Sequence, residues 1–408
     1  MLIKYAGSRD FAYACAVWKV FKSLSGTKKE NEIESLWDLL LQFKGPIVKV
    51  LQVLSGMPGL WSSPVAARLQ LLSSTSAPLS SSEWREYLKM MVPEIHPKLS
   101  FDSVHTGSLG QVHGVFWSQE EFRACKIQYP NMTEILKKDF KFLEIWSNLY
   151  QWWKPGIDTT HMLSHLYTSM KQELDYVQEG KWMQWFQKYF QAIPWIRIPS
   201  YYPEDSNPTT LMMSWVRGNN FSDELLRGLS QEMRDILSYR LLYAWYQPFF
   251  SKGILHADPH MGNYMWDENL CIYMVDFGCI CSFSNQWVIG AKALYTALLN
   301  KEKTEKIYST YFGFDPLSPM QTACIDQWAK FLYGPFLVEG VRSLSHSMVQ
   351  EGLNLLKDIH QTLQRHGPLR IPYEFLLLDR SCVALGSTLI RLQGALCWKT
   401  CFQNIMCS

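Results

Sequence analysis

Hydrophobic and polar positions change their spacing along the chain, and each change predicts a different kind of element. Residues 1–95 have the spacing of helices, broken by Gly and Pro and by the Ser-rich linker 73–82. Segments 111–117 and 121–129 are strand-like around a short polar turn, which predicts a β-hairpin. Two long helices are expected next, at 131–153 and at about 159–190.

The remainder of the chain is predicted to be mainly helical. Before it, 194–202 and 209–216 flank a polar Pro/Asp/Asn turn and are expected to form another strand pair. From residue 222 onward helices dominate, apart from short strands near 263–266 and 271–275. Strands with inserted helices, followed by a helical half, predict an α+β fold with two lobes.

Three regions are expected from this organisation. They are a helical N-terminal extension at 1–95, a lobe of β-strands with inserted helices at 96–217, and a mainly helical lobe at 218–408. The sequence shows no internal repeat, so a solenoid is not expected.

Composition narrows the class of protein. The 408 residues are 47% hydrophobic and 19% charged, which is typical of a globular chain. The formal net charge of +2 gives no reason to expect nucleic acid as a partner. Seventeen Trp and 14% aromatic residues indicate either a thick core or a face near lipid.

Any membrane contact is expected to be peripheral. The uncharged run 50–67 contains Gly and Pro, and Asp379 and Arg380 interrupt the apolar segment 375–390, so neither predicts a spanning helix. Residues 1–29 carry six Lys or Arg and one acid among aromatic residues, which fits either attachment to an anionic membrane or an ordinary solvated helix. The ten Cys have no disulfide or zinc spacing, which indicates a reducing compartment.

The stretch HADPHMGN at 256–263 carries the first candidate chemistry. His256, Asp258 and Asn263 reproduce the H-x-D-x4-N spacing of kinase catalytic loops. Asp258 can orient a nucleophile and accept its proton, and Asn263 can offer a neutral oxygen to Mg²⁺. Asp276 opens a D-F-G triplet directly after an apolar strand, where kinases place a charged metal ligand. This combination predicts phosphoryl transfer.

A cation for the phosphates is present upstream. Lys126 stands on the strand-like stretch ACKIQY, in a context similar to the V-A-I-K strand of kinases. A Lys on an apolar strand needs a charged partner, because a lone buried ammonium is costly. The helix QELDYVQEG offers Glu173, Asp175 and Glu179, of which Asp175 and Glu179 share a face at i,i+4 spacing.

Together these residues resemble the UbiB (aarF-domain) family of atypical protein-kinase-like proteins. The likeness covers about residues 40–395 and is densest in four motifs, SLGQVH at 108–113, ELDY at 173–176, HADPHMGN at 256–263 and VDFG at 275–278. It implies a kinase-like fold behind a helical extension, ATP or ADP and Mg²⁺ as cofactors, and a pair between Glu179 and Lys126. It also implies ATP hydrolysis or small-molecule phosphorylation rather than ordinary protein phosphorylation.

The resemblance assigns a regulatory role to the extension. In this family a Lys-x-Gly-Gln motif of the extension covers the active site, and Lys49 and Gln52 stand at its place, with Leu51 where the motif has Gly. By that likeness, Lys49 and Gln52 would reach toward Glu173 and Asp175.

Nucleotide binding is expected at two further places. Val104-His-Thr-Gly107 and Ser108 replace the Ala-rich nucleotide loop of the family, and Gly107 lets the backbone approach a phosphate. The hinge contains Met213 and Trp215, with Ser214 where the family usually has an acid. Adenine is normally held there by backbone groups, so binding is expected to survive.

The leading hypothesis is therefore an ATP- and Mg²⁺-dependent atypical kinase or ATPase that supports ubiquinone biosynthesis, with isoprenoid lipid or quinone-pathway proteins as partners. The alternative is a catalytically silent, nucleotide-gated protein that binds lipid or acts as a scaffold. A small-molecule kinase of the aminoglycoside or choline type shares the loop but lacks ELDY. A bacterial cytoplasm with peripheral contact to the inner membrane and the matrix side of a mitochondrion both fit the cysteine usage.

Overall fold

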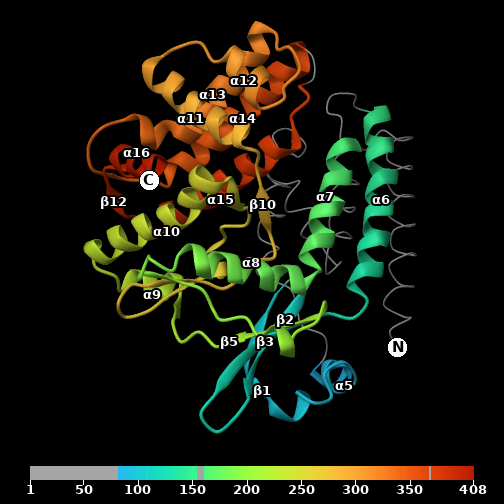
Figure 1. The fold of residues 1–408 in the computed structure, drawn as a ribbon. Coiled ribbons are helices and arrows are strands. Elements are labelled where there is room, and N and C mark those ends of the chain that lie inside the picture. Colours follow the sequence, from blue (N-terminus) through green and yellow to red (C-terminus); the bar gives the residue numbers. More distant parts are fainter. Residues whose placement is uncertain (1–80, 108, 154–159, 367–368) are drawn as a thin grey trace. The chain divides into compact units, whose positions relative to one another are not determined.

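The computed structural model describes residues 81–408 except 108, 154–159 and 367–368, and they form two compact units (Figure 1). The first unit contains the described residues up to Gly180 together with Tyr201–Trp215. The second contains Lys181–Ser200 and Val216–Ser408. The first is built on an antiparallel sheet and the second mainly on helices, which confirms the predicted α+β class.

A four-stranded antiparallel sheet in the order β1-β2-β3-β5 forms the centre of the first unit. Its strands are β1 (Leu99–Thr106), β2 (Gly110–Phe116), β3 (Phe122–Gln128) and β5 (Thr210–Ser214). The predicted hairpin at 111–129 is confirmed, since β2 and β3 pair from Gly110 opposite Gln128 to Phe116 opposite Phe122.

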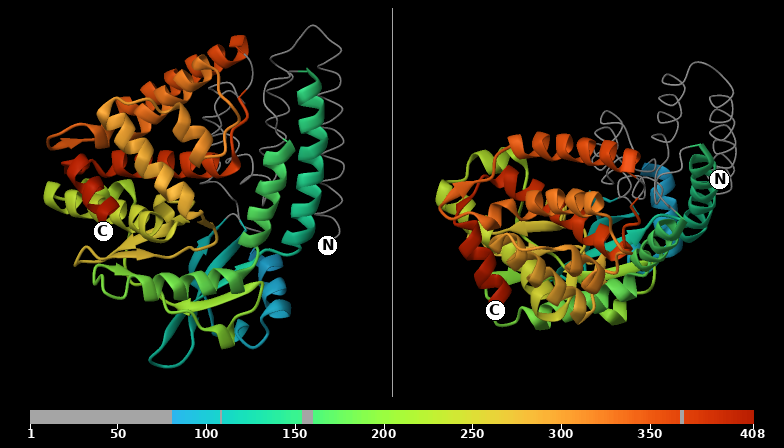
Figure 2. Two further views of the ribbon diagram at one scale, coloured as in Figure 1. Left: turned by 45° about the horizontal axis from the view of Figure 1, so that its top comes forward. Right: turned by 90° about the horizontal axis from the view of Figure 1, so that it is seen from above.

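Helices pack against this sheet and beside one another. Trp84 and Leu88 of α5 (Ser81–Met91) join a buried cluster with Val115 of β2 and Ile127 of β3. The helices α6 (Met132–Trp153) and α7 (Thr160–Glu173) lie side by side in all views (Figures 1 and 2). The described part of this unit is completed by the beginning of α8 (Tyr176–Tyr189) and two 3₁₀ turns, η2 (His96–Lys98) and η3 (Pro203–Asp205).

The single long helix predicted at about 159–190 is two helices, α7 and α8. The break falls at Asp175, whose carboxylate oxygen Oδ1 accepts hydrogen bonds from the backbone N–H groups of Val177 and Gln178 at 3.1 and 3.2 Å. Asp competes for backbone donors and therefore favours the N-cap over a helix interior. The prediction that Asp175 and Glu179 share one face of a helix was consequently wrong, because Asp175 is an exposed cap of α8 whereas Glu179 is buried inside that helix.

The strand pair predicted from 194–202 and 209–216 was also wrong. Only one isolated bridge joins these segments, between Tyr201 and Met213. Instead β4 (Ile196–Arg197) pairs in parallel with β9 (Ile272–Met274), and Ile196 is buried opposite Ile272. The burial of these two apolar side chains outweighs the local turn signal.

In the second unit, short strands and helices alternate. A sheet of order β4-β9-β8-β6 is accompanied by the pairs β7 with β10 and β11 with β12. The strands are β6 (Asn219–Asn220), β7 (Ile254–His256), β8 (Tyr264–Trp266), β10 (Ile280–Ser282), β11 (Arg342–Ser343) and β12 (Ala395–Leu396). The helices are α9 (Asp223–Arg227), α10 (Gln231–Lys252), α11 (Asn285–Asn300), α12 (Glu305–Tyr311), α13 (Pro319–Leu337), α14 (Ser347–His366), α15 (Tyr373–Leu392), α16 (Trp398–Cys407) and the 3₁₀ turn η4 (Met261–Asn263).

Aromatic side chains fill the core of this unit. The Phe402 ring, fully buried on α16, lies with its centroid 4.9 Å from that of Tyr246, 5.0 Å from Tyr295 and 4.5 Å from Phe336. Of the two explanations for the high aromatic content, these contacts support a thick core. Within the described ranges, none of the helices is long and apolar enough to cross a bilayer.

Candidate phosphoryl-transfer residues

Lys126 and Glu179 form a buried ion pair in the first unit. The Lys126 ammonium Nζ lies 2.7 Å from Oε1 and 3.0 Å from Oε2 of Glu179. The side chains are 15% and 2% exposed, so the pair is largely withdrawn from water. The ammonium also lies 5.1 Å from the ring centroid of Tyr176, whose face favours a cation. The structure thus brings together two of the residues that the sequence singled out.

The position of this pair follows from the two elements that carry it. Lys126 pairs with Leu211 of β5 and Val112 of β2, in the middle of the sheet. Gln128 of the same strand donates two hydrogen bonds, to the carbonyl oxygen of Leu174 at 2.6 Å and to that of Pro208 at 3.1 Å. The first of these bonds ties β3 to the short segment between α7 and α8.

The other predicted residues of the helical segment lie near the same break. Glu173 ends α7 and is buried, whereas Asp175 is exposed and caps α8. Lys49 and Gln52, expected to reach toward them, lie outside the described residues.

SLGQVH has a structural function that the sequence did not reveal. The indole Nε1 of Trp84 in α5 donates to the ring Nε2 of His113 at 3.0 Å. Burial lowers the pKa of His113, which keeps its ring neutral so that Nε2 can accept this bond. Gly110 is required for another reason, since a Cβ there would lie 2.3 Å from the carbonyl oxygen of Ile127. These motif residues therefore hold the sheet together and fasten α5 to it.

The residues expected to bind nucleotide lie toward opposite ends of the sheet, with Gly107 beside Gly110 and with Met213 and Trp215 at the other end of the strands. Gly107 follows β1, is exposed, and donates its N–H to the carbonyl oxygen of Gly110 at 2.8 Å, whereas Ser108 lies outside the described residues. Met213 is buried in β5 opposite Ala124. Trp215 follows that strand, and its ring centroid lies 5.0 Å from that of Phe122.

In the second unit, α10 ends where the HADPHMGN loop begins. Gly253 closes the helix with a φ of 66°, a left-handed conformation that Gly adopts without strain. A Cβ at Gly253 would also lie 2.4 Å from the carbonyl oxygen of Phe283. Earlier in α10, the indole Nε1 of Trp245 donates to the backbone carbonyl oxygen of His256 at 2.8 Å. The helix thus fixes the start of the loop.

His256 connects the loop to the D-F-G segment. Its ring Nε2 donates to the backbone carbonyl oxygen of Asp276 at 2.7 Å, and its Nδ1 lies 3.4 Å from the backbone N–H of Asp258 and accepts from it. Burial lowers the pKa of His256, and the neutral ring is the form that can donate at one nitrogen and accept at the other. A single buried imidazole therefore orders the backbone at both acids.

Asn263 completes this network. Its side-chain amide Nδ2 donates to the backbone carbonyl oxygen of Asp258 at 2.8 Å. The backbone carbonyl oxygen of Asn263 accepts from the backbone N–H of Val275 at 3.0 Å. Because Nδ2 is engaged, Oδ1 is the atom of this amide that can meet a cation. Asp276 uses Oδ1 to accept from the N–H of Gly278 at 2.9 Å. Hydrogen bonds therefore join Asp258, Asn263 and Asp276 in one segment.

This donor set fits Mg²⁺. No group of three or more His, Cys, Asp or Glu side chains in the described part of the chain could hold a metal by itself. Mg²⁺ commonly takes one or two protein ligands and fills its remaining positions with water and substrate phosphates. The carboxylate of Asp276 and the amide oxygen of Asn263 would supply two such protein ligands.

Helix α15 supports the loop, which the sequence analysis missed. The Ser381 hydroxyl lies 3.1 Å from the carbonyl oxygen of Ala257, and the Thr388 hydroxyl donates to the carbonyl oxygen of Pro259 at 3.3 Å. Arg380 of the same helix also approaches the loop, with its Nη2 3.7 Å from Oδ1 of Asp258. The only signal in the sequence was a charged residue that interrupts an apolar segment.

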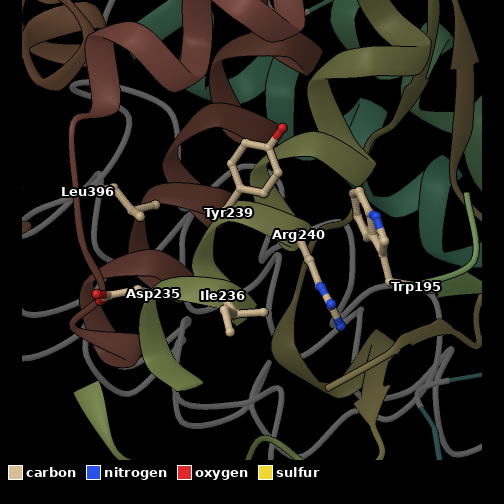
Figure 3. A pocket seen from close by; sticks show the side chains of 6 residues that line it. All are labelled: Trp195, Asp235, Ile236, Tyr239, Arg240 and Leu396. Atoms are coloured by element: carbon tan, nitrogen blue, oxygen red, sulfur yellow. The ribbon is translucent and has the colours of Figure 1, made fainter. Parts of the chain in front are cut away.

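A shallow pocket occupies a different part of the second unit. It has a volume of about 380 Å³, and its lining is mostly apolar (Figure 3). The guanidinium of Arg240 lies 5.4 Å from the ring centroid of Trp195 and donates to the carbonyl oxygen of Asn269. The pocket is lined by Trp195, Asp235, Ile236, Tyr239, Arg240 and Leu396 and contains none of the residues predicted for phosphoryl transfer.

Known proteins are similar in sequence to this chain. A family model described as the ABC1 atypical kinase-like domain matches residues 78–309. The chain is 24% identical over 357 residues to a chloroplastic aarF domain-containing protein kinase of Arabidopsis thaliana, covering 85% of this chain and 49% of that protein. It is 23% identical over 390 residues to AarF domain-containing protein kinase 1 of Xenopus laevis, covering 90% and 74%. A further relative is slr1919 of Synechocystis, 24% identical over 385 residues, with coverage of 92% and 66%.

The fold is also shared with a solved structure. Rv3197 of Mycobacterium tuberculosis, in its complex with erythromycin, superposes with a TM-score of 0.60 at 22% identity, covering 92% of this chain and 96% of that one. This likeness confirms the predicted kinase-like α+β fold. The chain spans about half to two thirds of the length of the Arabidopsis and Synechocystis relatives. Because the family model matches more than half of the 408 residues, the chain belongs to the ABC1 (aarF-domain, UbiB-like) family of atypical kinase-like proteins.

Proposed function

We propose that this protein is an ATP- and Mg²⁺-dependent atypical kinase or ATPase that serves ubiquinone or related isoprenoid-quinone metabolism. The observation that carries the proposal is the hydrogen-bonded segment that joins Asp258, Asn263 and Asp276. Phosphoryl transfer demands few groups but demands that they be held in place before the reaction begins. A buried neutral His256 and the amide of Asn263 provide that order.

In the proposed reaction, Lys126 binds the phosphates of the nucleotide. Its ammonium is held by both carboxylate oxygens of Glu179, so little side-chain freedom has to be lost on binding. The pair is 15% and 2% exposed, and in such surroundings a positive charge acts more strongly on a phosphate than in water. Gly107 and Ser108 would approach the phosphates through their backbone, and Met213 and Trp215 would hold the adenine.

Asp258 orients the nucleophile and accepts its proton. The nucleophile is water for an ATPase and a hydroxyl group for a kinase. Asn263 and Asp276 would hold Mg²⁺, and the bound ion would supply positive charge that neutralises the charge developing on the phosphates. The backbone of Asp258, the side-chain amide of Asn263 and the carboxylate of Asp276 each form a hydrogen bond within the segment.

The quinone pathway enters the proposal through the likeness to UbiB proteins, and so do its partners, isoprenoid lipid and quinone-pathway proteins. We propose that contact with the bacterial inner membrane, or with the matrix side of the mitochondrial membrane, is peripheral. The silent, lipid-binding alternative was motivated by the aromatic content, but the aromatic residues of the second unit pack into its core. That packing favours the enzyme.

The test is nucleotide hydrolysis by the purified protein with Mg²⁺, with and without anionic liposomes. The comparison variants are Asp258→Asn and, as a matched control, Asp315→Asn, because Asp315 is an exposed acid with a loose 3.9 Å contact to Arg370. Turnover that is retained in the control and lost in Asp258→Asn supports the proposal. Nucleotide binding without turnover in the wild type, with or without liposomes, would support the silent alternative. Isoprenoid-quinone content of cells that carry Asp258→Asn tests the pathway.

A further inference from the structure

Arg380 approaches Asp258 without forming a hydrogen bond to it. Nη2 lies 3.7 Å from Oδ1 of Asp258, beyond the usual 2.7–3.2 Å of such a bond. Both side chains are about four-fifths buried, at 21% and 23% exposed. Among the described residues this is the only ion pair or hydrogen bond of the Arg380 side chain, although a guanidinium has five N–H donors.

Other arginines of the chain that are withdrawn from water behave differently. Arg123 makes three hydrogen bonds, two to Glu121 and one to Asp205, at 2.7–3.1 Å. Arg234 also makes three, to the backbone carbonyl oxygens of Leu229, Leu392 and Leu226. Withdrawn donors that lack a partner cost about 1–3 kcal/mol each, so structural arginines acquire partners. The donors of Arg380 are therefore disposed to bind something other than the protein.

The charges around Arg380 indicate what it would bind. Asp258 and Asp276 place two negative charges in the same loop segment, and they would repel an anionic acceptor substrate. The guanidinium offsets Asp258 at the point where the acceptor hydroxyl must arrive. Its positive charge also acts on Cys281 of β10, whose thiol pKa is lowered first by a hydrogen bond with Cys279 and further by Arg380, against the opposing effect of burial.

We propose that Arg380 binds an oxyanion group of the acceptor substrate, so that the acceptor is an alcohol that carries a phosphate or a carboxylate. A planar guanidinium presents parallel N–H donors that match the oxygens of both groups. The inference rests on the proposed phosphotransferase function and adds the class of acceptor to it.

The proposed reaction transfers the γ-phosphoryl group of ATP to the acceptor alcohol. The acceptor hydroxyl oxygen forms a bond to the γ-phosphorus, and the bond between that phosphorus and the oxygen bridging to the β-phosphate breaks. The electron pair of the broken bond leaves with ADP. The hydroxyl proton passes to Asp258, and Arg380 holds the oxyanion throughout without changing its protonation.

Binding of small probes to the full chain tests the inference directly. The probes are glycerol 3-phosphate, glycerate and neutral glycerol, at constant ionic strength, and binding is measured by calorimetry or by ligand NMR. The proteins are the wild type, Arg380→Gln, Arg380→Lys and Arg391→Gln. Arg391 is a matched control because it lies on the same helix and pairs with Asp223 on the surface.

We expect glycerol 3-phosphate, glycerate or both to bind the wild type and Arg391→Gln, with affinity at least about tenfold lower in Arg380→Gln, since a charged hydrogen bond is worth about 1.5–3 kcal/mol. Arg380→Lys should recover part of the affinity, and glycerol should bind no variant. Preference between the two anionic probes identifies the group. Equal affinity in the wild type and Arg380→Gln, or no saturable binding to the wild type, overturns the inference. Melting curves of each variant show whether it is folded.

The result is separable from the proposed function. Binding of an anion that depends on Arg380 in a protein without nucleotide turnover would retain this site and remove the phosphotransferase. Turnover that depends on Asp258 in a protein that binds neither anionic probe would do the reverse.

Discussion

The ammonium of Lys126 donates to both carboxylate oxygens of Glu179, which lies 53 residues further along the chain. Glu179 is 2% exposed in its side chain, so its charge depends on partners within the protein, and Lys126 is one of them. The two residues come from a strand and a helix that the Gln128 side chain helps to hold in register. The pair therefore constrains the fold, and under the proposed function it also places the ammonium that binds phosphate.

Glu179→Gln is expected to impair nucleotide binding and to destabilise the first unit. Breaking a buried pair leaves an uncompensated charge and commonly costs about 3–5 kcal/mol. Loss of an oriented charge at such a site reduces the rate by about 10²–10³-fold. Nucleotide affinity, the rate of nucleotide hydrolysis and urea unfolding of the variant measure these effects.

The control for this variant is Glu134→Gln. Glu134 pairs with Lys137 at a similar distance, 2.8 Å, but the two side chains are 66% and 55% exposed. Water screens such a pair, so neither affinity nor unfolding should change measurably. Equal effects of the two substitutions would show that the burial of the Lys126 pair has no special role.

Asp276→Asn is expected to abolish the Mg²⁺-dependent part of nucleotide affinity. Asn can still accept the hydrogen bond from Gly278 but offers Mg²⁺ no negative charge. The affinity of the variant with Mg²⁺ should fall to the affinity that the wild type shows in a chelator. Asp267→Asn is a suitable control, because Asp267 accepts hydrogen bonds from Asn269 and Cys271 in a turn away from the loop. Unchanged Mg²⁺ dependence in Asp276→Asn would refute the role of Asp276 as a ligand.

Gly110→Ala should destabilise the sheet of the first unit. The new Cβ would lie 2.3 Å from the carbonyl oxygen of Ile127, and a backbone atom cannot move away as a flexible side chain can. Overpacking of this kind costs about 1–3 kcal/mol. Gly386→Ala, in the interior of α15 with open space around the added Cβ, should stabilise by up to about 1 kcal/mol. Thermal melting of both variants checks the opposite signs, and a loss in both would contradict the steric explanation.

The sequence predicted what depends on short spacing. The H-x-D-x4-N loop, the D-F-G triplet and the β2–β3 hairpin are each set by a short continuous stretch of sequence, and the hairpin lies where it was expected. The start of helix α8 was missed because Asp175 was placed inside one long helix. In the structure its carboxylate caps the backbone, which is a known preference of Asp that the sequence analysis did not apply at this position.

Contacts across long sequence distances could not be predicted. Ser381 and Thr388 reach the loop from 124 and 129 residues away, and neither belongs to a motif. A hydroxyl on an apolar helix has no signature that tells which carbonyl oxygen it will meet. Ile196 is similar, because the sequence analysis paired its segment with 209–216, whereas its partner is Ile272 of β9. The burial of apolar residues that are distant in the chain decides such pairings, and a local sequence pattern does not show which distant residue the partner will be.

Asp379, next to Arg380 on α15, should make stability depend on pH. Its carboxylate is 8% exposed and accepts a hydrogen bond from the indole Nε1 of Trp328 on α13. Burial raises the pKa of Asp379 from 3.8 to about 7, and the Trp328 hydrogen bond opposes this only in part. Between these two values the folded protein holds a proton that the unfolded chain has released. The contribution of this group is therefore most favourable below pH 3.8, is lost as pH rises toward 7, and is constant above it.

Asp379→Asn isolates this contribution, because Asn stays neutral at every pH and can still accept from Trp328. The free energy of unfolding of the variant minus that of the wild type should be small near pH 4 and should grow by up to about 4 kcal/mol by pH 8, since each unit of pKa corresponds to about 1.4 kcal/mol. Urea unfolding at several pH values measures the difference, and acids elsewhere in the chain cancel in the subtraction. A difference that is the same at pH 4 and pH 8 would mean that the carboxyl group of Asp379 has the same pKa in the folded and unfolded chains. In that event the hydrogen bond from Trp328 offsets the whole cost of burying the charge, and α13 would then be a stabiliser of charged Asp379 beside Arg380.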